Sequence, residues 1–273
     1  MALNQKHALI TGSSRGIGRG VALKLAADGV KIGVHYYQNE SAAKGTLEEV
    51  RRRGSDGFLV RADVRRPEQI TNMFGEVKAR FGKVDIFVAN ARPEAAEFFT
   101  PAMDITLQQW DTAFDSQAKA FLIAVREASA LMPEGGRIIA MTYAQGSRTG
   151  GLQPWVGMGS AKAAMESLVR YFEVALAKRG ITVNAISPGW TENSVLNSLP
   201  DQVQDLLRSW HKRGWTPMGC LGTPEDSGNV VALFCSEQAN WITGQIIYAD
   251  GGASLMTPEV PPEIQFGQKP KQP

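Results

Sequence analysis

The segment TGSSRGIG, residues 11–18, decides the fold because it joins a short apolar run to a long helical stretch. The apolar run HALIT (7–11) indicates a strand, and helical periodicity continues from the turn to Gly29. A glycine-rich turn between a strand and a helix lets the backbone approach a pyrophosphate at the positive end of the helix. A tight turn without a ligand is the alternative. We expect the whole turn to bind a dinucleotide: Gly12, Ser13, Ser14, Arg15, Gly16, Ile17 and Gly18.

Outward from this turn, short apolar runs alternate with helical stretches along the chain. The expected strands lie at 7–11, 31–35, 57–62, 84–90, 136–141, 181–187 and 245–252. Strands rich in Val, Ile and Phe that alternate with helices predict a parallel sheet covered on both faces. We expect a single Rossmann-type, doubly wound α/β domain over residues 1–256, with a seven-stranded, mainly parallel sheet. The proline-rich tail 257–273 is expected to be extended or disordered, although Ile264 and Phe266 offer apolar side chains that can dock.

Local signals mark several helix ends. Pro67 opens a helix whose apolar positions share one face. These positions are Ile70, Met73, Phe74, Val77 and Phe81. Thr223 followed by Pro224 indicates an N-cap and the first residue of a later helix.

Bulk composition excludes several classes of protein. The 273 residues suffice for one α/β domain, and 43% hydrophobic and 21% charged residues are ordinary for a globular protein. A net charge of +2, without a basic stripe interleaved with aromatic residues, argues against nucleic acid as a partner. No apolar run is long enough to span a membrane, and the start leads straight into a strand. With only Cys220 and Cys235, we expect no disulfide framework and a cytoplasmic location.

Further landmarks follow the glycine turn in order: ADV (62–64), ANA (89–91), NAISPG (184–189) and ITGQIIYADGG (242–252). Together with TGSSRGIG they resemble the signature of the short-chain dehydrogenase/reductase family, over residues 5–255; Arg92 stands where that family has a glycine. The resemblance implies cofactor contacts from Asp63 and Val64 at the adenine, from Pro188 and Gly189 beside the nicotinamide, and from Asn90, Ala91, Thr191 and Asn193. Structural roles are the alternative: Asp63 can cap a turn, and Asn90 can bridge strands.

The end of the second expected strand bears on the choice of cofactor. NAD-dependent relatives place a carboxylate there to accept the ribose hydroxyls. This chain has Tyr36 at that position, and Arg15 in the glycine turn suits a 2′-phosphate because a guanidinium donates a fork of hydrogen bonds. A solvated Arg15 is the alternative. We expect NADP(H), bound near Tyr36 and Arg15, rather than NAD(H).

The expected catalytic residues depart from the family pattern. Typical members use Ser, Tyr and Lys, with the tyrosine one helical turn before the lysine. In QPWVGMGSAK (153–162) Lys162 is present, but Met158 replaces that tyrosine. Tyr143 stands at the serine and Gln117 at an accessory asparagine. We expect Lys162 to hold the nicotinamide ribose and to lower the pKa of a nearby hydroxyl; a surface lysine is the alternative.

The pattern is closer to the enoyl-thioester reductase branch of the family. That branch uses Tyr-x6-Lys, often reads MGxAK, and carries a further tyrosine after the fifth strand. By this alignment Tyr143 and Lys162 are retained, and Trp155 replaces the inner tyrosine. We expect these three residues to form the catalytic site, with the Trp155 indole N–H donating to an oxyanion without releasing its proton. Packing in the cleft wall is the alternative for Trp155 and Tyr143.

The segment 190–218 lies where the family has a mobile substrate loop. Its apolar side chains are candidates for an acyl channel, with helix packing as the alternative: Val195, Leu196, Leu199, Leu206, Leu207 and Trp210. Arg208, Lys212 and Arg213 are candidates for contacting an acidic carrier protein or a CoA phosphate. A solvated charged face is the alternative for them.

The chemistry favours an enoyl substrate. Ketone reduction creates an alkoxide that needs a positioned acid, whereas hydride addition to Cβ of an enoyl thioester creates an enolate that needs oxyanion stabilisation. We expect an NADPH-dependent enoyl reductase of the kind used in fatty acid biosynthesis, acting on acyl-carrier-protein or CoA thioesters. A carbonyl reductase with Tyr143 as its acid and a cofactor-binding pseudoenzyme are the alternatives. The resemblance also implies a homo-oligomer, a tetramer or a dimer.

Overall fold

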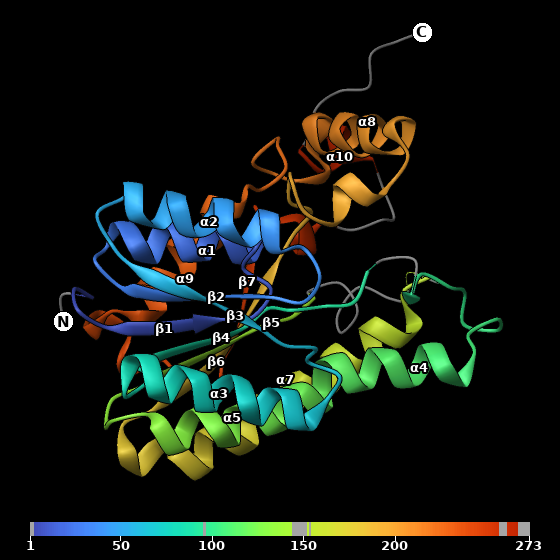
Figure 1. The fold of residues 1–273 in the computed structure, drawn as a ribbon. Helices are drawn as coiled ribbons and strands as arrows, with labels where there is room; N and C mark the ends of the chain where they lie inside the picture. The colour runs from blue at the N-terminus through green and yellow to red at the C-terminus, as the bar shows by residue number, and fades with distance from the viewer. Residues whose placement is uncertain (1–2, 95–96, 144–151, 153, 257–260, 267–273) are drawn as a thin grey trace, which may run out of the picture.

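The computed structural model describes residues 3–94, 97–143, 152, 154–256 and 261–266 (Figure 1). Its centre is a parallel sheet built from β1 (His7–Ile10), β2 (Lys31–Tyr36), β3 (Gly57–Arg61), β4 (Ile86–Ala89), β5 (Arg137–Met141), β6 (Thr182–Pro188) and β7 (Ile246–Ala249). The strand order β3-β2-β1-β4-β5-β6-β7 reverses its direction of winding beside β1. Every pairing in this seven-stranded sheet is parallel. The expected Rossmann-type fold is confirmed.

Helices cover both faces of the sheet (Figure 1). One layer holds α1 (Gly16–Ala27), α2 (Glu40–Arg52) and α9 (Pro224–Cys235), and the other holds α3 (Pro67–Phe81), α5 (Ala120–Leu131) and α7 (Val156–Leu176). α4 (Leu107–Phe114) runs through a π-helical turn, η2 (Asp115–Lys119), into α5. The remaining segments are η3 (Ala177–Arg179), η4 (Val195–Ser198), α8 (Asp201–Trp210), η5 (His211–Trp215), η6 (Glu237–Ala239), η7 (Ala253–Leu255) and α10 (Pro262–Gln265). None of the helices in the described ranges is long and apolar enough to cross a membrane.

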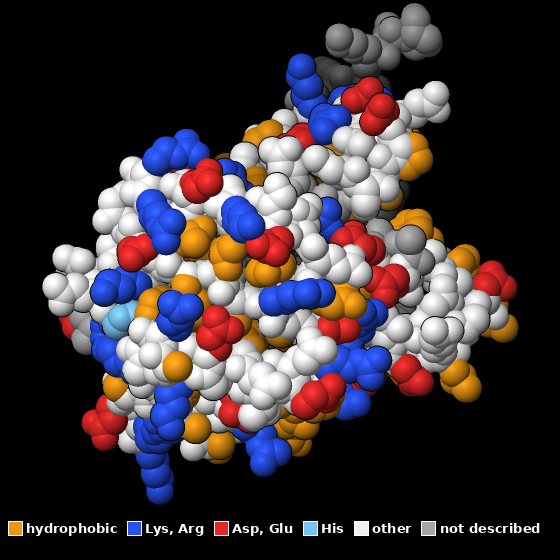
Figure 2. Space-filling model, viewed as in Figure 1, with side chains coloured by type: hydrophobic (Ala, Val, Ile, Leu, Met, Phe, Trp, Pro, Cys, Tyr) orange, Lys and Arg blue, Asp and Glu red, His pale blue; other side chains and the backbone are white. Residues whose placement is uncertain are grey.

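The two largest clusters of the buried core lie on opposite sides of the sheet, because side chains alternate along a strand. On β4, Phe87 belongs to the cluster under α3, α5 and α7, and Ile86 and Val88 belong to the cluster under α1, α2 and α9. Outside the core, acidic and basic side chains are mixed over the face shown in Figure 2.

Helix α3 shows how local signals and packing agree. It begins at Pro67 as expected and ends before Gly82, which has φ 75°. Four of its five expected apolar residues are buried: Ile70, Met73, Phe74 and Val77. Phe81 is partly buried against the same cluster. The sequence pattern therefore predicted the start and the buried face of this helix.

The tail differs from its expected extended form. In the described part, Pro262–Gln265 is a helical turn, α10, that packs on η5. A Cβ atom added to Gly214 would lie 3.0 Å from the Phe266 ring, so Phe266 docks on η5. The apolar contact stabilises a turn that composition alone did not indicate. Residues 257–260 and 267–273, and the Ile264 side chain, lie outside the described part of the chain.

Candidate active site

A cleft of about 760 Å³ lies at the carboxyl ends of the strands, where sheets of this kind bind ligands. Most of the expected site residues line it: Gly12, Ser14, Arg15, Gly16, Ile17, Tyr36, Asp63, Val64, Asn90, Ala91, Tyr143, Trp155, Lys162, Pro188, Gly189, Thr191 and Asn193. Ser13 and Gly18 do not line it. The fold therefore brings residues from seven separate chain segments to one cleft.

The glycine turn has the geometry that a dinucleotide requires. Gly12 and Gly16 have φ angles of 68° and 58°, in the region that favours glycine. Gly18 packs so closely that an added Cβ would lie 2.4 Å from the Gly12 carbonyl oxygen. No side chain caps the first turn of α1, whose N-cap is Arg15. The backbone N–H groups at this helix end therefore remain available for a pyrophosphate.

Ser13 holds the turn in place instead of facing the cleft. Its hydroxyl donates to the Ile10 carbonyl at 2.8 Å and accepts from the His35 backbone N–H at 3.0 Å. The His35 ring accepts from the Gly12 N–H at Nδ1 (2.8 Å), so Nε2 carries the proton and donates to the Ala62 carbonyl (3.1 Å). Burial lowers the pKa of His35 to about 4, so the ring is neutral. No sequence signal indicated this role of His35.

Asn90 bridges the turn and the central strand. Its amide Nδ2 donates to the Thr11 carbonyl at 2.9 Å and to the Gly12 carbonyl at 3.2 Å. The Thr11 hydroxyl accepts from the backbone N–H groups of Asn90 and Ala91. The side-chain donors of Asn90 are thus engaged within the protein, which agrees with the strand-bridging alternative, although Asn90 also lines the cleft.

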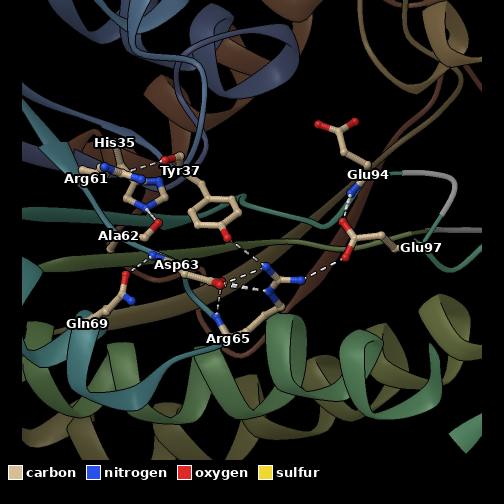
Figure 3. A network of polar contacts seen from close by, with 9 residues as sticks. All are labelled: His35, Tyr37, Arg61, Ala62, Asp63, Arg65, Gln69, Glu94 and Glu97. Atoms are coloured by element: carbon tan, nitrogen blue, oxygen red, sulfur yellow. Dashed lines mark hydrogen bonds and ion pairs between the residues drawn. The ribbon is translucent and has the colours of Figure 1, made fainter. Parts of the chain in front are cut away.

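The resemblance places the adenosine of the cofactor beside Asp63, and we call this part of the cleft the adenosine end. The Asp63 carboxylate there is held by Arg65 (Figure 3). The Arg65 guanidinium donates to both Asp63 oxygens, at 2.9 and 3.1 Å from Nε and 2.9 Å from Nη2. Burial raises the pKa of Asp63, but the hydrogen bonds from Arg65 outweigh it and hold the pKa below its ordinary value. Arg65 also contacts the Tyr37 hydroxyl (3.3 Å) and the Glu97 carboxylate (2.9 Å). Sequence reasoning missed Arg65, although a basic residue directly after ADV was visible.

Tyr143, Trp155 and Lys162 are the expected catalytic residues, and we call the part of the cleft that they line the catalytic end. Lys162 lies buried there. Its side chain is 6% exposed, and Nζ donates to the Met141 carbonyl at 2.5 Å. Burial and, to a smaller extent, the nearby Arg92 together lower the pKa of Lys162 to about 7, and Glu166 opposes the shift. The surface-lysine alternative is therefore wrong.

An aromatic cluster stands where the family tyrosine would lie. Trp155 is the N-cap of α7 and is 7% exposed. Its ring centroid lies 5.0 Å from that of Phe98 and 5.2 Å from that of Tyr143, and Met158 packs in the same cluster. The Trp155 Nε1 atom is buried and has no hydrogen-bond partner among the described residues. Trp155 thus packs in the cleft wall and also carries an unused donor.

Tyr143 lines the same end of the cleft, directly after β5. Burial raises the pKa of Tyr143 to about 12. The phenol therefore keeps its proton near neutral pH.

Gln117, at the accessory asparagine position, does not line the cleft. It lies in the π-helical turn η2, where Nε2 donates to the Ala91 carbonyl at 3.1 Å. Its neighbour Ser116 lines the cleft instead. π-Helical turns often occur at functional sites because they shift which side chains face inward.

Arg92 also lines the catalytic end of the cleft, where the family has a glycine. Its Nη1 donates to the Pro93 carbonyl at 2.8 Å, and burial lowers the pKa of its guanidinium. The substitution was visible in the sequence, but its burial beside Lys162 was not. This end of the cleft thus contains two basic side chains.

The segment 190–218 contributes one side of the cleft. Val195 lines the cleft and packs against the aromatic cluster, and Leu196 is fully buried. Leu206 and Trp210 are 51% and 44% exposed and do not line it. Arg208 donates to both Glu192 oxygens at 2.8 and 2.9 Å, so it fixes α8 to the segment after β6.

Comparisons with known proteins identify the family. Residues 12–254 match the protein family described as enoyl-(acyl carrier protein) reductase. The chain is 36% identical over 250 residues to a 1-cyclohexenylcarbonyl-CoA reductase of Streptomyces collinus, covering 92% of this chain and 87% of that protein. It is 32% identical over 249 residues to a 3-oxoacyl-[acyl-carrier-protein] reductase of Staphylococcus epidermidis, covering 90% and 98%. The solved structure of the angucycline C-6 ketoreductase LanV with bound NADP matches with a TM-score of 0.83 and 34% identity, over 93% of this chain and 98% of LanV. The chain belongs to the short-chain dehydrogenase/reductase family of oxidoreductases.

Proposed function

We propose that this protein is an NADPH-dependent reductase of enoyl thioesters. The observation that carries the proposal is the absence of a hydroxyl one helical turn before Lys162 on α7. Met158 occupies that position, 1% exposed in the aromatic cluster. Without the family tyrosine, the site is poorly equipped to protonate an alkoxide, but it retains donors for an enolate oxygen.

The bound NADPH supplies a hydride to Cβ of the substrate. Lys162 holds the nicotinamide ribose. The rest of the cofactor is held by the glycine turn, by Tyr36, Asp63 and Val64, and by the cleft-lining residues that follow β4 and end or follow β6. The Tyr143 hydroxyl and the Trp155 indole N–H donate hydrogen bonds to the thioester oxygen as enolate charge develops on it. Water then delivers the proton to Cα, so no side chain has to act as a strong acid.

The charges of the cleft support an anionic transition state. Lys162 and Arg92 lie at the catalytic end, whereas the carboxylates that line the cleft belong to Asp63, Glu94 and Glu97. Arg65 donates hydrogen bonds to both Asp63 and Glu97 at the adenosine end (Figure 3). Positive charge near the reacting oxygen stabilises an enolate more than it stabilises the neutral thioester.

Steady-state assays on matched crotonyl and acetoacetyl thioesters test the proposal. We expect the wild type to reduce the enoyl substrate faster than the ketone. Trp155→Tyr adds a phenol that can also donate a proton and is expected to raise the enoyl rate, since general-acid catalysis contributes about 10²–10⁴-fold when well placed. Tyr143→Phe removes a donor and is expected to lower the rate by about 10-fold or more.

A carbonyl reductase is the second candidate. The 3-oxoacyl-[acyl-carrier-protein] reductase and ketoreductase relatives favour it, with Tyr143 as the acid. Faster ketone than enoyl reduction by the wild type would establish it in place of the enoyl proposal. Cofactor binding without turnover of either substrate would instead indicate a pseudoenzyme.

The cofactor and assembly form part of the same proposal. NADPH is preferred over NADH because Tyr36, not a carboxylate, ends β2 and because LanV was solved with NADP. The substrate carrier is acyl carrier protein or CoA, and the assembly is a homotetramer or dimer, which sedimentation measures. A cytoplasmic location stays a prediction.

A further inference from the structure

Two arginines at the adenosine end of the cleft have their partners on one short segment after β4. Arg15, in the glycine turn, forms an ion pair with Glu94. The Arg65 Nη1 atom donates to the Glu97 carboxylate at 2.9 Å (Figure 3). All four side chains line the cleft. A guanidinium binds a carboxylate and a phosphate through the same fork of donors.

The hydrogen-bond partners of Arg65 differ in how easily a phosphate can replace them. The Asp63 side chain is 9% exposed and holds the guanidinium from the buried side, whereas the Glu97 side chain is 41% exposed. The Tyr37 hydroxyl lies 3.3 Å from Nη2, and the guanidinium carbon lies 5.4 Å from the centre of the Tyr37 ring. Asp63 and Tyr37 thus orient Arg65, and Glu97 accepts from its Nη1 group at the open side.

The Arg15 pair is also open to exchange. The Arg15 and Glu94 side chains are 63% and 57% exposed, so neither is fixed by burial. Exposed pairs of this kind are weak and screened by salt. A phosphate monoester carries about −1.5 to −2 charges at pH 7, so it competes well against a single carboxylate for either arginine.

We propose that Glu94 and Glu97 act as internal competitors of the cofactor 2′-phosphate, and that Arg65 together with Arg15 recognises that phosphate. This inference rests on the proposed preference for NADPH and adds Arg65 as a specificity-determining residue. In the free protein Glu94 pairs with Arg15, and Glu97 pairs with Arg65, which Asp63 also holds. A cofactor with a 2′-hydroxyl has no charge to exchange for them.

Calorimetric titration with adenosine 2′,5′-bisphosphate and with 5′-AMP tests the inference without catalysis. Glu94→Gln and Glu97→Gln keep side-chain size but remove the competing charge. Each is expected to tighten binding of the bisphosphate about 2- to 5-fold, to leave 5′-AMP within about twofold, and to lose its effect at high salt. Glu76→Gln, on α3 outside the cleft, is the matched control and is expected to change neither affinity.

Arginine variants complete the test. Arg65→Gln and Arg15→Ala are each expected to weaken bisphosphate binding about tenfold or more and to leave 5′-AMP little affected. Glu97→Gln is expected to have no further effect in the Arg65→Gln background, because the pair is already broken. Bisphosphate affinities that are unchanged in the glutamate variants, while the wild type still prefers the bisphosphate, would overturn this inference alone. Equal wild-type affinity for both nucleotides would overturn the NADPH preference itself.

Discussion

Our proposal for the catalytic end of the cleft depends on three side chains that line it together with Lys162. The Met158 side chain has no proton that it can donate. Trp155 has a buried N–H that can donate a hydrogen bond but cannot release its proton. Tyr143 has a hydroxyl whose pKa is raised by burial to about 12. At the scale of single residues, these groups are the basis of our proposal that the site holds an oxyanion rather than protonating one.

The buried Lys162 makes folding stability depend on pH. Burial lowers its pKa from 10.5 to about 7, so between these pH values the unfolded chain binds a proton that the folded chain does not. Stability therefore rises with pH across this window, and below about pH 7 the folded state bears the full cost of the buried charge.

Replacing Lys162 by Met removes this dependence. From pH 7 to pH 9.5, we expect the wild type to gain about 1–3 kcal/mol of unfolding free energy relative to Lys162→Met, measured by urea denaturation. Lys178→Met, on the exposed turn η3, is the control and is expected to follow the wild-type profile. Parallel profiles for wild type and Lys162→Met would contradict the shifted pKa.

At the scale of elements, helix α7 sets the spacing of the catalytic end. Residues one helical turn apart lie on the same face, and both Met158 and Lys162 line the cleft. The helix therefore already presents the position from which family members supply an acid. What differs from those family members is the side chain at that position, because Met158 has no hydroxyl.

Met158→Tyr is expected to restore ketone reduction. A phenol beside Lys162 has its pKa lowered when the lysine is protonated, at or below about pH 7, and can protonate an alkoxide, so we expect acetoacetyl thioester reduction at pH 7 to rise at least about tenfold. Met158→Phe matches the added ring without the hydroxyl and is expected to show no gain. Equal ketone rates for the Tyr and Phe variants would show that the helix does not aim this position at the substrate.

The glycine turn depends on a close crossing between α1 and α9. A Cβ on Gly20 would lie 2.2 Å from the Pro224 carbonyl oxygen, and a Cβ on Gly228 would lie 2.8 Å from the Gly20 carbonyl oxygen. These glycines let the two helices approach each other. The crossing supports α1, whose first turn faces the cleft.

Gly20→Ala is expected to lower the free energy of unfolding by about 1–3 kcal/mol, because the helices must separate to admit the methyl group. Gly75→Ala, inside α3 with nothing within 4 Å of the added Cβ, is expected to raise it by about 0.5–1 kcal/mol. Urea denaturation of both variants measures the difference. A Gly20 variant as stable as the Gly75 variant would show that the crossing tolerates a side chain.

At the scale of the whole molecule, the sheet is stabilised by a core on each face, and β4 contributes to both. Phe87 is fully buried, with its ring centroid 5.5 Å from that of Phe74 on α3. Asn90 and Arg92, in the segment directly after β4, line the cleft, so the strand links core packing to the cleft.

Phe87→Ala is expected to lower the unfolding free energy by about 3–5 kcal/mol, because it removes a buried ring and leaves a cavity between β4 and α3. Leu233→Ala, on α9 at a side chain that is 58% exposed, is the control, with an expected change within about 0.5 kcal/mol. Thermal and urea unfolding measure both. Similar losses for the two variants would contradict the burial of the central strand.

The sequence by itself determined the architecture and the place of the cleft. Glycines at fixed spacing in residues 11–18, apolar runs for the strands and Pro67 at the start of α3 are local features, and local backbone preferences fix turns and helix ends. Lys162 was identified through the resemblance to the family's catalytic helix, and helical spacing placed it on the same face as Met158 and Trp155. The direction of the sheet followed from the alternation of strands and helices.

Only the tertiary structure decided which residues of the cleft pair through hydrogen bonds and ion pairs. Arg65 and Glu97 are separated by 32 residues, and Ser13 and His35 by 22, so no local pattern pairs them. The burial that shifts the pKa of Lys162 and Tyr143 depends on elements that converge from across the chain. Hydrogen bonding and desolvation act between neighbours in space, and the sequence specifies those neighbours only once the parallel strands have brought their carboxyl ends together.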